Sequence, residues 1–345
     1  MKAVTIPPVD AGRLGAWLEA HAPGFGGLRS MSRIVGGNSN PIWRLVADSG
    51  RYVLRTQPAG TLLKSAHALD REVRVLRALD GSAVPVARVH AYCRDPDAIG
   101  VCFYLMSDVE GEVHRDPRLP GVPHENRIAI FDAAIDQMAA VHRLDIDALG
   151  LRDFGRPGHY FERQLHRWRE QYHTSMPEGE PTLDALIARL GAAMPPDDEA
   201  PVLLHGDSRL DNLMFFRGLP RVAAVLDWEL STLGHPLADL GQFLAVQALP
   251  ADYLLPGLSG VDRAAEGLPG SAHQAARYFA AVGRQPRDLR YYQAFAMFRQ
   301  AAMSAGLRRR ARLGTAVAES AAFFGDTLDV FARLGLRMLD GEFLP

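Results

Sequence analysis

Residues 205–212 of the chain read HGDSRLDN, and residues 225–229 read VLDWE. Apolar runs lie between these two polar segments and predict two strands joined by a short turn. In an antiparallel hairpin, the residue before the first strand lies opposite the residue after the second strand. We therefore expect Asn212 and Asp227 to lie side by side at the open end of a hairpin.

These residue types suit phosphoryl transfer from a metal-bound nucleotide. An amide oxygen of Asn212 and a carboxylate of Asp227 are hard ligands of the kind that Mg²⁺ prefers. Asp207 precedes Asn212 by five positions and is placed to accept a proton from an attacking hydroxyl. Aspartate and asparagine are also ordinary turn residues, but a plain turn needs no second carboxylate at the matched end. The segment therefore predicts a base beside a metal site.

HGDSRLDN followed by VLDWE resembles the catalytic segment of aminoglycoside phosphotransferases, choline kinases and related protein-kinase-like enzymes. The resemblance implies an α+β, bilobal protein-kinase-like fold with a small β-rich N-lobe and a larger, mostly helical C-lobe. It implies that Asp207 is the catalytic base and that Asn212 and Asp227 are the metal ligands. By the same resemblance, His205 braces the loop through hydrogen bonds.

Residues 227–234, DWELSTLG, and residues 236–241, PLADLG, narrow this resemblance to one branch of the superfamily. That branch includes the kinase-like domains fused to some acyl-CoA dehydrogenases. It implies that Asp239 anchors the catalytic loop from the start of a helix, where an aspartate is also favoured for its interaction with the helix dipole. Two positions depart from the pattern: His235 stands where an aspartate is expected, and Ser208 replaces a more usual tyrosine.

A glycine-rich stretch in the first third is the candidate phosphate loop. Its glycines allow close approach of the backbone to phosphates, although the same pattern suits a plain hairpin turn. It is neither a Walker loop nor a Rossmann fingerprint. The resemblance implies that this loop covers the nucleotide, and its residues are Gly36, Gly37, Asn38, Ser39 and Asn40.

Arg55 ends a predicted strand, where kinases of this type place a lysine that holds the α- and β-phosphates. Glu72 lies on the following predicted helix, where the partner of that lysine is expected. A guanidinium is planar and binds phosphate bidentately, so Arg55 keeps the expected role. The alternatives are a solvated charge at the end of a strand for Arg55 and a solvated helix pair for Glu72.

The change from strand-rich to helix-rich sequence predicts two lobes. We expect an N-terminal nucleotide-binding lobe at 1–106, a hinge at 107–111, and a C-terminal catalytic and substrate-binding lobe at 112–345. By resemblance, the main chain of Ser107 and Val109 in the hinge bonds the adenine.

The composition limits the class of protein. The chain has 345 residues, of which 48% are hydrophobic and 23% charged, so it has material for a core and is not disordered. Its formal net charge of -2 gives no electrostatic case for binding nucleic acid or an anionic membrane. No signal peptide or membrane span is visible, and Cys93 and Cys102 form no CxxC pair. We expect a cytoplasmic monomer or homodimer with free thiols.

The expected activity is transfer of the γ-phosphate of ATP or GTP to a hydroxyl of a small molecule, with Mg²⁺ as cofactor. Acidic residues of the C-terminal part do not cluster as a polycationic aminoglycoside would require, so a hydroxyacyl-CoA-type acceptor is the first candidate and aminoglycoside phosphorylation the alternative. Aromatic and arginine residues at 160–169 could line an acceptor pocket, but a core stripe is favoured. A weakly catalytic nucleotide-binding regulator and a metal-dependent hydrolase using His205, Asp207 and Asp227 remain as rivals.

Overall fold

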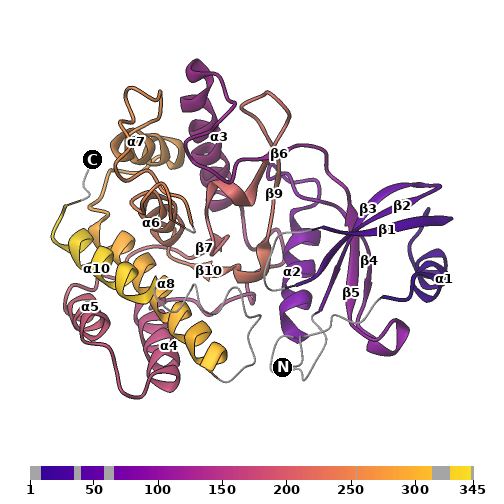
Figure 1. Ribbon diagram of the computed structural model, residues 1–345, viewed down its shortest axis with the longest axis horizontal. Coiled ribbons are helices and arrows are strands. Elements are labelled where there is room, and N and C mark those ends of the chain that lie inside the picture. The colour runs from indigo at the N-terminus through magenta and orange to yellow at the C-terminus, as the bar shows by residue number, and fades with distance from the viewer. Residues whose placement is uncertain (1–8, 35–39, 58–65, 254, 313–326, 343–345) are drawn as a thin grey trace. The chain divides into compact units, whose positions relative to one another are not determined.

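A computed structural model describes residues 9–34, 40–57, 66–253, 255–312 and 327–342. The chain forms two compact units (Figure 1). The first unit comprises residues 2–111 and 223–231, and the second unit comprises residues 112–222 and 232–345. The sequence-based division assigned 223–231 to the second lobe. In the structure this short segment belongs to the first unit.

The first unit is built on an antiparallel sheet with the strand order β1-β2-β3-β5-β4. Each neighbouring pair in this order is antiparallel. The strands are β1 (Leu28–Ile34), β2 (Ile42–Ala47), β3 (Gly50–Thr56), β4 (Val89–Cys93) and β5 (Phe103–Ser107).

Two helices complete this unit. Helix α1 (Ala11–His21) begins after Asp10, whose side chain accepts hydrogen bonds from two N–H groups of the first turn. Leu14 and Leu18 of this helix are fully buried with apolar residues of the sheet. Helix α2 (Ala66–Leu79) buries an apolar stripe that includes Leu69, Val73 and Leu76.

Hydrogen bonds explain why 223–231 belongs to the first unit. The segment contains the end of β9 (Val222–Val225) and the short helix η3 (Trp228–Leu230). The Val225 N–H donates to the Pro85 carbonyl at 2.8 Å, and Arg71 of α2 donates to the Ser231 carbonyl at 3.1 Å. Both ends of the segment are therefore fastened to the first unit.

The second unit is mostly helical. Its described helices are α3 (His124–His142), α4 (Tyr160–Ser175), α5 (Pro181–Ala192), α6 (Leu237–Val246), α7 (Ser271–Val282), α8 (Arg290–Arg312) and α10 (Thr327–Leu339). Helix α8 packs against α4, α6 and α10. Between α3 and α4, residues 143–159 form turns and irregular backbone. The aromatic side chains of α4, including Phe161 and Trp168, are buried, which confirms the favoured interpretation as core.

Short strands frame the loop at 205–212. Strand β7 (Val202–Leu204) pairs with β10 (Thr232–Gly234), and β6 (Glu112–Val113) pairs with β8 (Leu213–Phe215). The loop between β7 and β8 is therefore held at both ends by strands of the same unit. After β8, a turn closed by a hydrogen bond from the Phe216 N–H to the Arg221 carbonyl (3.0 Å) leads into β9.

The described part of the chain contains no helix that is long and apolar enough to cross a membrane. Both cysteines are free thiols; Cys93 is buried and Cys102 is half-buried.

Candidate active site

The loop between β7 and β8 places Asn212 against Asp207. The Asn212 Nδ2 group donates to the Asp207 carbonyl at 2.7 Å and to Asp207 Oδ2 at 3.1 Å. The Asp207 side chain is 19% exposed, so its carboxylate is accessible while one oxygen is held. Because the nitrogen of the Asn212 amide is used within the loop, its Oδ1 is the atom suited to a cation.

Asp239 lies in the first turn of α6 and holds the start of this loop. Its Oδ2 accepts a hydrogen bond from the His205 N–H at 2.7 Å, and its Oδ1 accepts one from the Gly206 N–H at 2.9 Å. Burial alone would raise the pKa of Asp239, but the hydrogen bond and charge of His142, with the bond from Gly206, hold it below the ordinary value. Asp239 is therefore ionised at neutral pH and accepts both bonds as a carboxylate.

A second buried pair of residues fixes Asp239 in turn. His142 Nε2 lies 3.2 Å from Asp239 Oδ2, and its Nδ1 lies 2.7 Å from the Tyr278 hydroxyl. A carboxylate can only accept, so the His142 Nε2–H donates to Asp239, while Nδ1 and the Tyr278 hydroxyl share a second hydrogen bond. All three side chains are buried. Sequence reasoning did not predict this chain of bonds, because its members come from α3, α6 and α7.

His235, which stands where an aspartate was expected, is also buried and acts as a helix-start residue. Its Nδ1 accepts a hydrogen bond from the Leu237 N–H at 3.2 Å, and its ring stacks on Tyr292. Burial is the main cause that lowers the pKa of His235 to about 4. The neutral ring therefore supplies the acceptor that an aspartate would have supplied.

In the first unit, the buried guanidinium of Arg55 contacts three carboxylates. Its Nη1 lies 3.1 Å from Glu72 Oε1, and its Nη2 lies 2.9 Å from both Asp227 Oδ1 and Glu229 Oε2. Arg55 is 5% exposed and Glu72 is 2% exposed. The alternative that these two residues are solvated charges is therefore wrong. Glu229 is a partner that the sequence-based prediction of the site did not include.

The charges of this group shift one another. Burial would lower the pKa of Arg55, but the attraction of Glu72, Asp227 and Glu229 outweighs it, so the pKa is raised and the guanidinium stays charged. Burial, assisted by the charges of Asp227 and Glu229, raises the pKa of Glu72 to about 7 against the opposing effect of Arg55. Glu72 is therefore the member of the group that titrates near neutral pH.

Asp227 has an uncommon backbone conformation, with φ 60° and ψ 65°. A residue with a Cβ in this left-handed region carries a strain of roughly 1 kcal/mol or more, although aspartate tolerates it better than most residues. Strain of this kind often accompanies a functional position. The Asp227 side chain remains 36% exposed while its Oδ1 contacts Arg55, so part of the carboxylate is accessible to a cation.

The remaining predicted nucleotide residues are described only in part. Gly36, Gly37, Asn38 and Ser39 lie outside the described residues. Asn40 donates through Nδ2 to Glu229 Oε2 at 3.2 Å, which joins the end of the glycine-rich loop to the Arg55 group.

At the predicted hinge, the Ser107 N–H donates to the Arg88 carbonyl at 2.9 Å. The Ser107 hydroxyl lies 2.9 Å from His90 Nε2. The Ser107 N–H is therefore already used within the first unit, and an adenine contact from the remaining main-chain groups of Ser107 and Val109 stays a prediction. Val109 follows in an irregular segment after β5.

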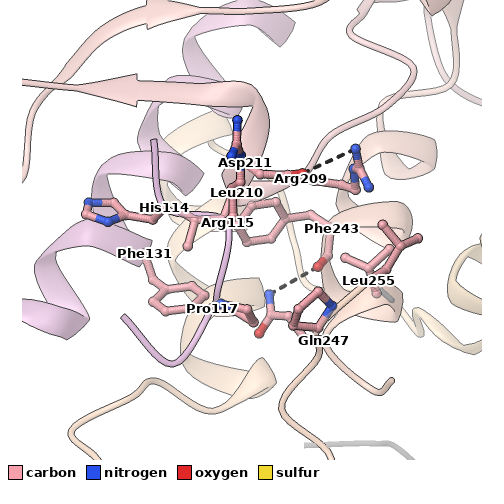
Figure 2. Close-up of a pocket in the computed structure, with 12 residues that line it drawn as sticks. His114, Arg115, Pro117, Phe131, Arg209, Leu210, Asp211, Phe243, Gln247 and Leu255 are labelled. Atoms are coloured by element: carbon pink, nitrogen blue, oxygen red, sulfur yellow. Dashed lines mark hydrogen bonds and ion pairs between the residues drawn. The ribbon is translucent and has the colours of Figure 1, made fainter. Parts of the chain in front are cut away.

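A pocket in the second unit adjoins the loop that carries Asp207 (Figure 2). From this loop, Arg209 and Asp211 face the pocket, and Arg209 Nη2 lies 3.3 Å from Asp211 Oδ2 and 3.4 Å from Asp207 Oδ2. Burial raises the pKa of Asp211. The other lining residues are mainly apolar, and they are His114, Arg115, Pro117, Phe131, Leu210, Phe243, Val246, Gln247, Leu255 and Pro256.

Among the described residues, no group of three or more His, Cys, Asp or Glu side chains has the geometry of a metal site. The predicted metal ligands, Asn212 and Asp227, belong to different units. Their proximity stays a prediction from the hairpin pattern.

Comparison with known proteins assigns the chain to a family. The model of the phosphotransferase enzyme family matches residues 30–295. Acyl-CoA dehydrogenase family member 11 of Mus musculus is 36% identical over 95% of this chain and 43% of its own length. The protein of the same name from Homo sapiens is 34% identical over the same shares. The chain thus spans less than half the length of these curated relatives.

Comparison with solved structures leads to the same family and fold. A protein from Ralstonia eutropha JMP134 assigned to the aminoglycoside phosphotransferases is 40% identical, covers 96% of this chain and 99% of its own, and superposes with a TM-score of 0.86. A mutant of aminoglycoside phosphotransferase APH(4)-Ia, solved with ADP and hygromycin B, is 17% identical, covers 93% and 97% of the two chains, and has a TM-score of 0.59, which shows the fold alone. The predicted kinase-like fold and branch are confirmed, as is the class of enzyme. The chain belongs to the phosphotransferase enzyme family.

Proposed function

We propose that the chain transfers the γ-phosphoryl group of ATP or GTP to a hydroxyl of a small molecule, in a reaction that depends on Mg²⁺. The observation that carries the proposal is the loop in which Asn212 holds Asp207 through two hydrogen bonds while Asp239 holds the two preceding N–H groups. A loop fixed in this way presents a carboxylate in one orientation, as a general base requires.

In this reaction Asp207 accepts the proton of the attacking hydroxyl. Its Oδ2 is held at 3.1 Å by Asn212, and the carboxylate is accessible because the side chain is 19% exposed. The transition state of phosphoryl transfer is loose, so orientation of the hydroxyl and neutralisation of charge account for most of the rate.

Asn212 and Asp227 would hold the metal. The accessible oxygens are an amide Oδ1 and part of a carboxylate that is 36% exposed, and both are hard donors that fit Mg²⁺. Two protein ligands are enough because Mg²⁺ keeps several waters and binds substrate phosphates. When bound, the metal supplies positive charge to the phosphate oxygens.

Arg55 would position the phosphates, beneath the glycine-rich loop of residues 36–40. In the structure its Nη2 is shared between Asp227 and Glu229, at 2.9 Å from each. A metal on Asp227 would compete for that carboxylate, and Arg55 would then remain paired with Glu72 and Glu229. These two carboxylates keep the guanidinium in place in either case.

The acceptor is proposed to have an apolar body and an anionic group, as a hydroxyacyl-CoA-type substrate does. The pocket beside the catalytic loop has apolar walls that include Phe131 and Phe243, with two arginines and a single carboxylate, Asp211. A polycation would be repelled by Arg115 and would meet one carboxylate, Asp211, which is already paired with Arg209. The names of the relatives, acyl-CoA dehydrogenase family members, support an acyl substrate.

A second candidate is phosphorylation of an aminoglycoside. It is supported by the 40% identical Ralstonia protein, which is assigned to the aminoglycoside phosphotransferases.

The test is a screen for nucleotide consumption with Mg-ATP and Mg-GTP against sugars, amino alcohols, aminoglycosides and hydroxyacyl-CoA esters. The wild-type protein and Asp207→Asn are compared with each acceptor. We expect acceptor-dependent release of nucleoside diphosphate only from the wild-type protein, and most strongly with hydroxyacyl-CoA esters. Nucleotide binding without turnover of any acceptor would favour a regulatory nucleotide-binding protein and would count against the proposal.

A further inference from the structure

The peptide group between Gly206 and Asp207 is held from a helix distant in the sequence. Arg299, on α8, donates through Nη2 to the Gly206 carbonyl. On the other side of the same residue, the Gly206 N–H donates to Asp239 Oδ1 at 2.9 Å. The next N–H, that of Asp207, donates to His205 Nδ1 at 3.2 Å. Both polar groups of Gly206 are therefore bonded to charged side chains.

The backbone conformation at Gly206 needs contacts from outside the loop to stabilise it. Gly206 has φ 83°, in the left-handed region where glycine is tolerated. Glycine is also the residue with the greatest backbone freedom, so rotation about its ψ would turn the peptide plane from which Asp207 extends. Asp239 accepts from the Gly206 N–H, which lies on the N-terminal side of this ψ bond. Arg299 donates to the Gly206 carbonyl, which lies on the C-terminal side. The peptide plane of Asp207 is therefore held at both of its polar groups, at the carbonyl by Arg299 and at the N–H by His205 Nδ1.

Arg299 lies on a helix whose packing fixes its position beside the loop. Its neighbour Phe298 is fully buried, and α8 packs against α6, which carries Asp239. The hydrogen bond joins a cationic donor to a neutral carbonyl, and such a bond is stronger than one between neutral groups. The buried Arg299 Nε atom has no hydrogen-bond partner among the residues that the structure describes. By contrast, Arg290 at the start of α8 is paired with Asp288 at 2.7 Å.

We propose that Arg299 is a positioning residue for phosphoryl transfer, which holds the Gly206 carbonyl and thereby aims the carboxylate of Asp207 at the attacking hydroxyl. The inference rests on the proposed function, in which Asp207 is the base. A misplacement of a catalytic group by about 1 Å can lower a rate about 100-fold. Loss of the Arg299 contact should therefore lower kcat without weakening the binding of nucleotide.

The experiment measures Mg-ATP hydrolysis with water as acceptor, the affinity for Mg-ATP by calorimetry, and Tm. The variants are Arg299→Ala, Arg299→Lys and, as a matched control on the same helix, Arg290→Ala. We expect kcat to fall about 10- to 100-fold in Arg299→Ala, with Kd for Mg-ATP within about twofold of the wild-type value. Arg299→Lys keeps a cationic donor and should recover part of the rate, and Arg290→Ala should match the wild-type protein.

A double-mutant cycle with Asp207→Asn separates positioning from general support of the fold. If Arg299 acts through Asp207, then Arg299→Ala should lower the residual rate of Asp207→Asn by no more than about twofold. An unchanged kcat in a folded Arg299→Ala protein would overturn the inference, as would a full multiplicative loss in the double mutant. If Arg299→Ala does not fold, the same cycle with Arg299→Lys decides.

These outcomes are distinct from a failure of the proposed function. If the wild-type protein turns over ATP and Asp207→Asn does so equally, Asp207 is not the base, and both the proposed mechanism and the inference fail. If Asp207→Asn is impaired and both Arg299 variants are not, the inference alone fails.

Discussion

The replacement of Asp239 by asparagine removes the negative charge under the catalytic loop while keeping the shape of the side chain. Asp239 Oδ2 accepts from the His205 N–H at 2.7 Å and from His142 Nε2 at 3.2 Å, and Oδ1 accepts from the Gly206 N–H at 2.9 Å. An amide has one acceptor oxygen. Even in its better orientation, with oxygen at the Oδ2 position, its NH₂ group faces the Gly206 N–H and leaves that buried donor unpaired.

The cost follows from these contacts. An unpaired buried N–H costs about 1–3 kcal/mol, and a hydrogen bond to a charged acceptor that becomes neutral loses roughly 1 kcal/mol more. We therefore expect Asp239→Asn to lower the free energy of unfolding by about 3 kcal/mol. Asp239 belongs to the unit formed by 112–222 and 232–345. For a unit of about 200 residues, a loss of this free energy corresponds to a fall in Tm of about 6–12 °C.

The measurement is denaturant and thermal unfolding of the two proteins at neutral pH. Asp329→Asn is the matched control, because Asp329 forms an exposed pair with Arg333 at 2.7 Å on α10 and should change stability by less than about 1 kcal/mol. An Asp239→Asn protein within about 1 kcal/mol of the wild-type protein would refute the reasoning. Because the pKa of Asp239 is lowered by folding, its contribution is complete above the ordinary aspartate pKa and is lost as the pH falls through the lower folded value.

Three further predictions concern the proposed base, the proposed metal ligand and the titration of Glu72. Asp207→Ala should lower turnover about 10²- to 10⁴-fold while Mg-ATP still binds by calorimetry; undiminished activity would contradict its assignment as base. Asp227→Ala should lose the Mg²⁺-dependent part of nucleotide binding, and stabilisation by Mg-ATP equal to that of the wild-type protein in a thermal shift assay would count against this. The pKa of Glu72 is raised to about 7, so the wild-type protein should lose stability as the pH rises from the ordinary glutamate range towards 7. Unfolding measured across that range should lack this slope in Glu72→Gln, and an identical slope in both proteins would show that Glu72 does not titrate there.

Local patterns in the sequence predicted much of the fold. The core stripe at 160–169 and the two strands between HGDSRLDN and VLDWE follow from periodicity and turn residues over short windows, and the structure has them as part of α4 and as β8 and β9. The family and the fold class were predicted from the resemblance that HGDSRLDN and VLDWE carry, and these two segments are local features of the sequence.

What the sequence did not predict depends on contacts between distant residues. Glu229 reads as a polar residue after a strand, and only the folded unit brings it to 2.9 Å from Arg55, 174 positions earlier. Arg299 and Gly206 are 93 positions apart. His235 reads as a departure from the family pattern, because a sequence does not indicate that burial will keep its ring neutral and able to accept the Leu237 N–H.

The assignment of residues 223–231 to the first unit has a consequence for modularity. The backbone leaves this unit after residue 111 and returns to it only for the nine residues 223–231, which contribute Asp227 and Glu229. A gene fragment ending at residue 111 would encode a sheet whose buried Arg55 had lost two of its three carboxylate partners. Recombination within this chain would therefore be expected to disrupt it. Relatives that match 95% of this chain contain it within a longer protein.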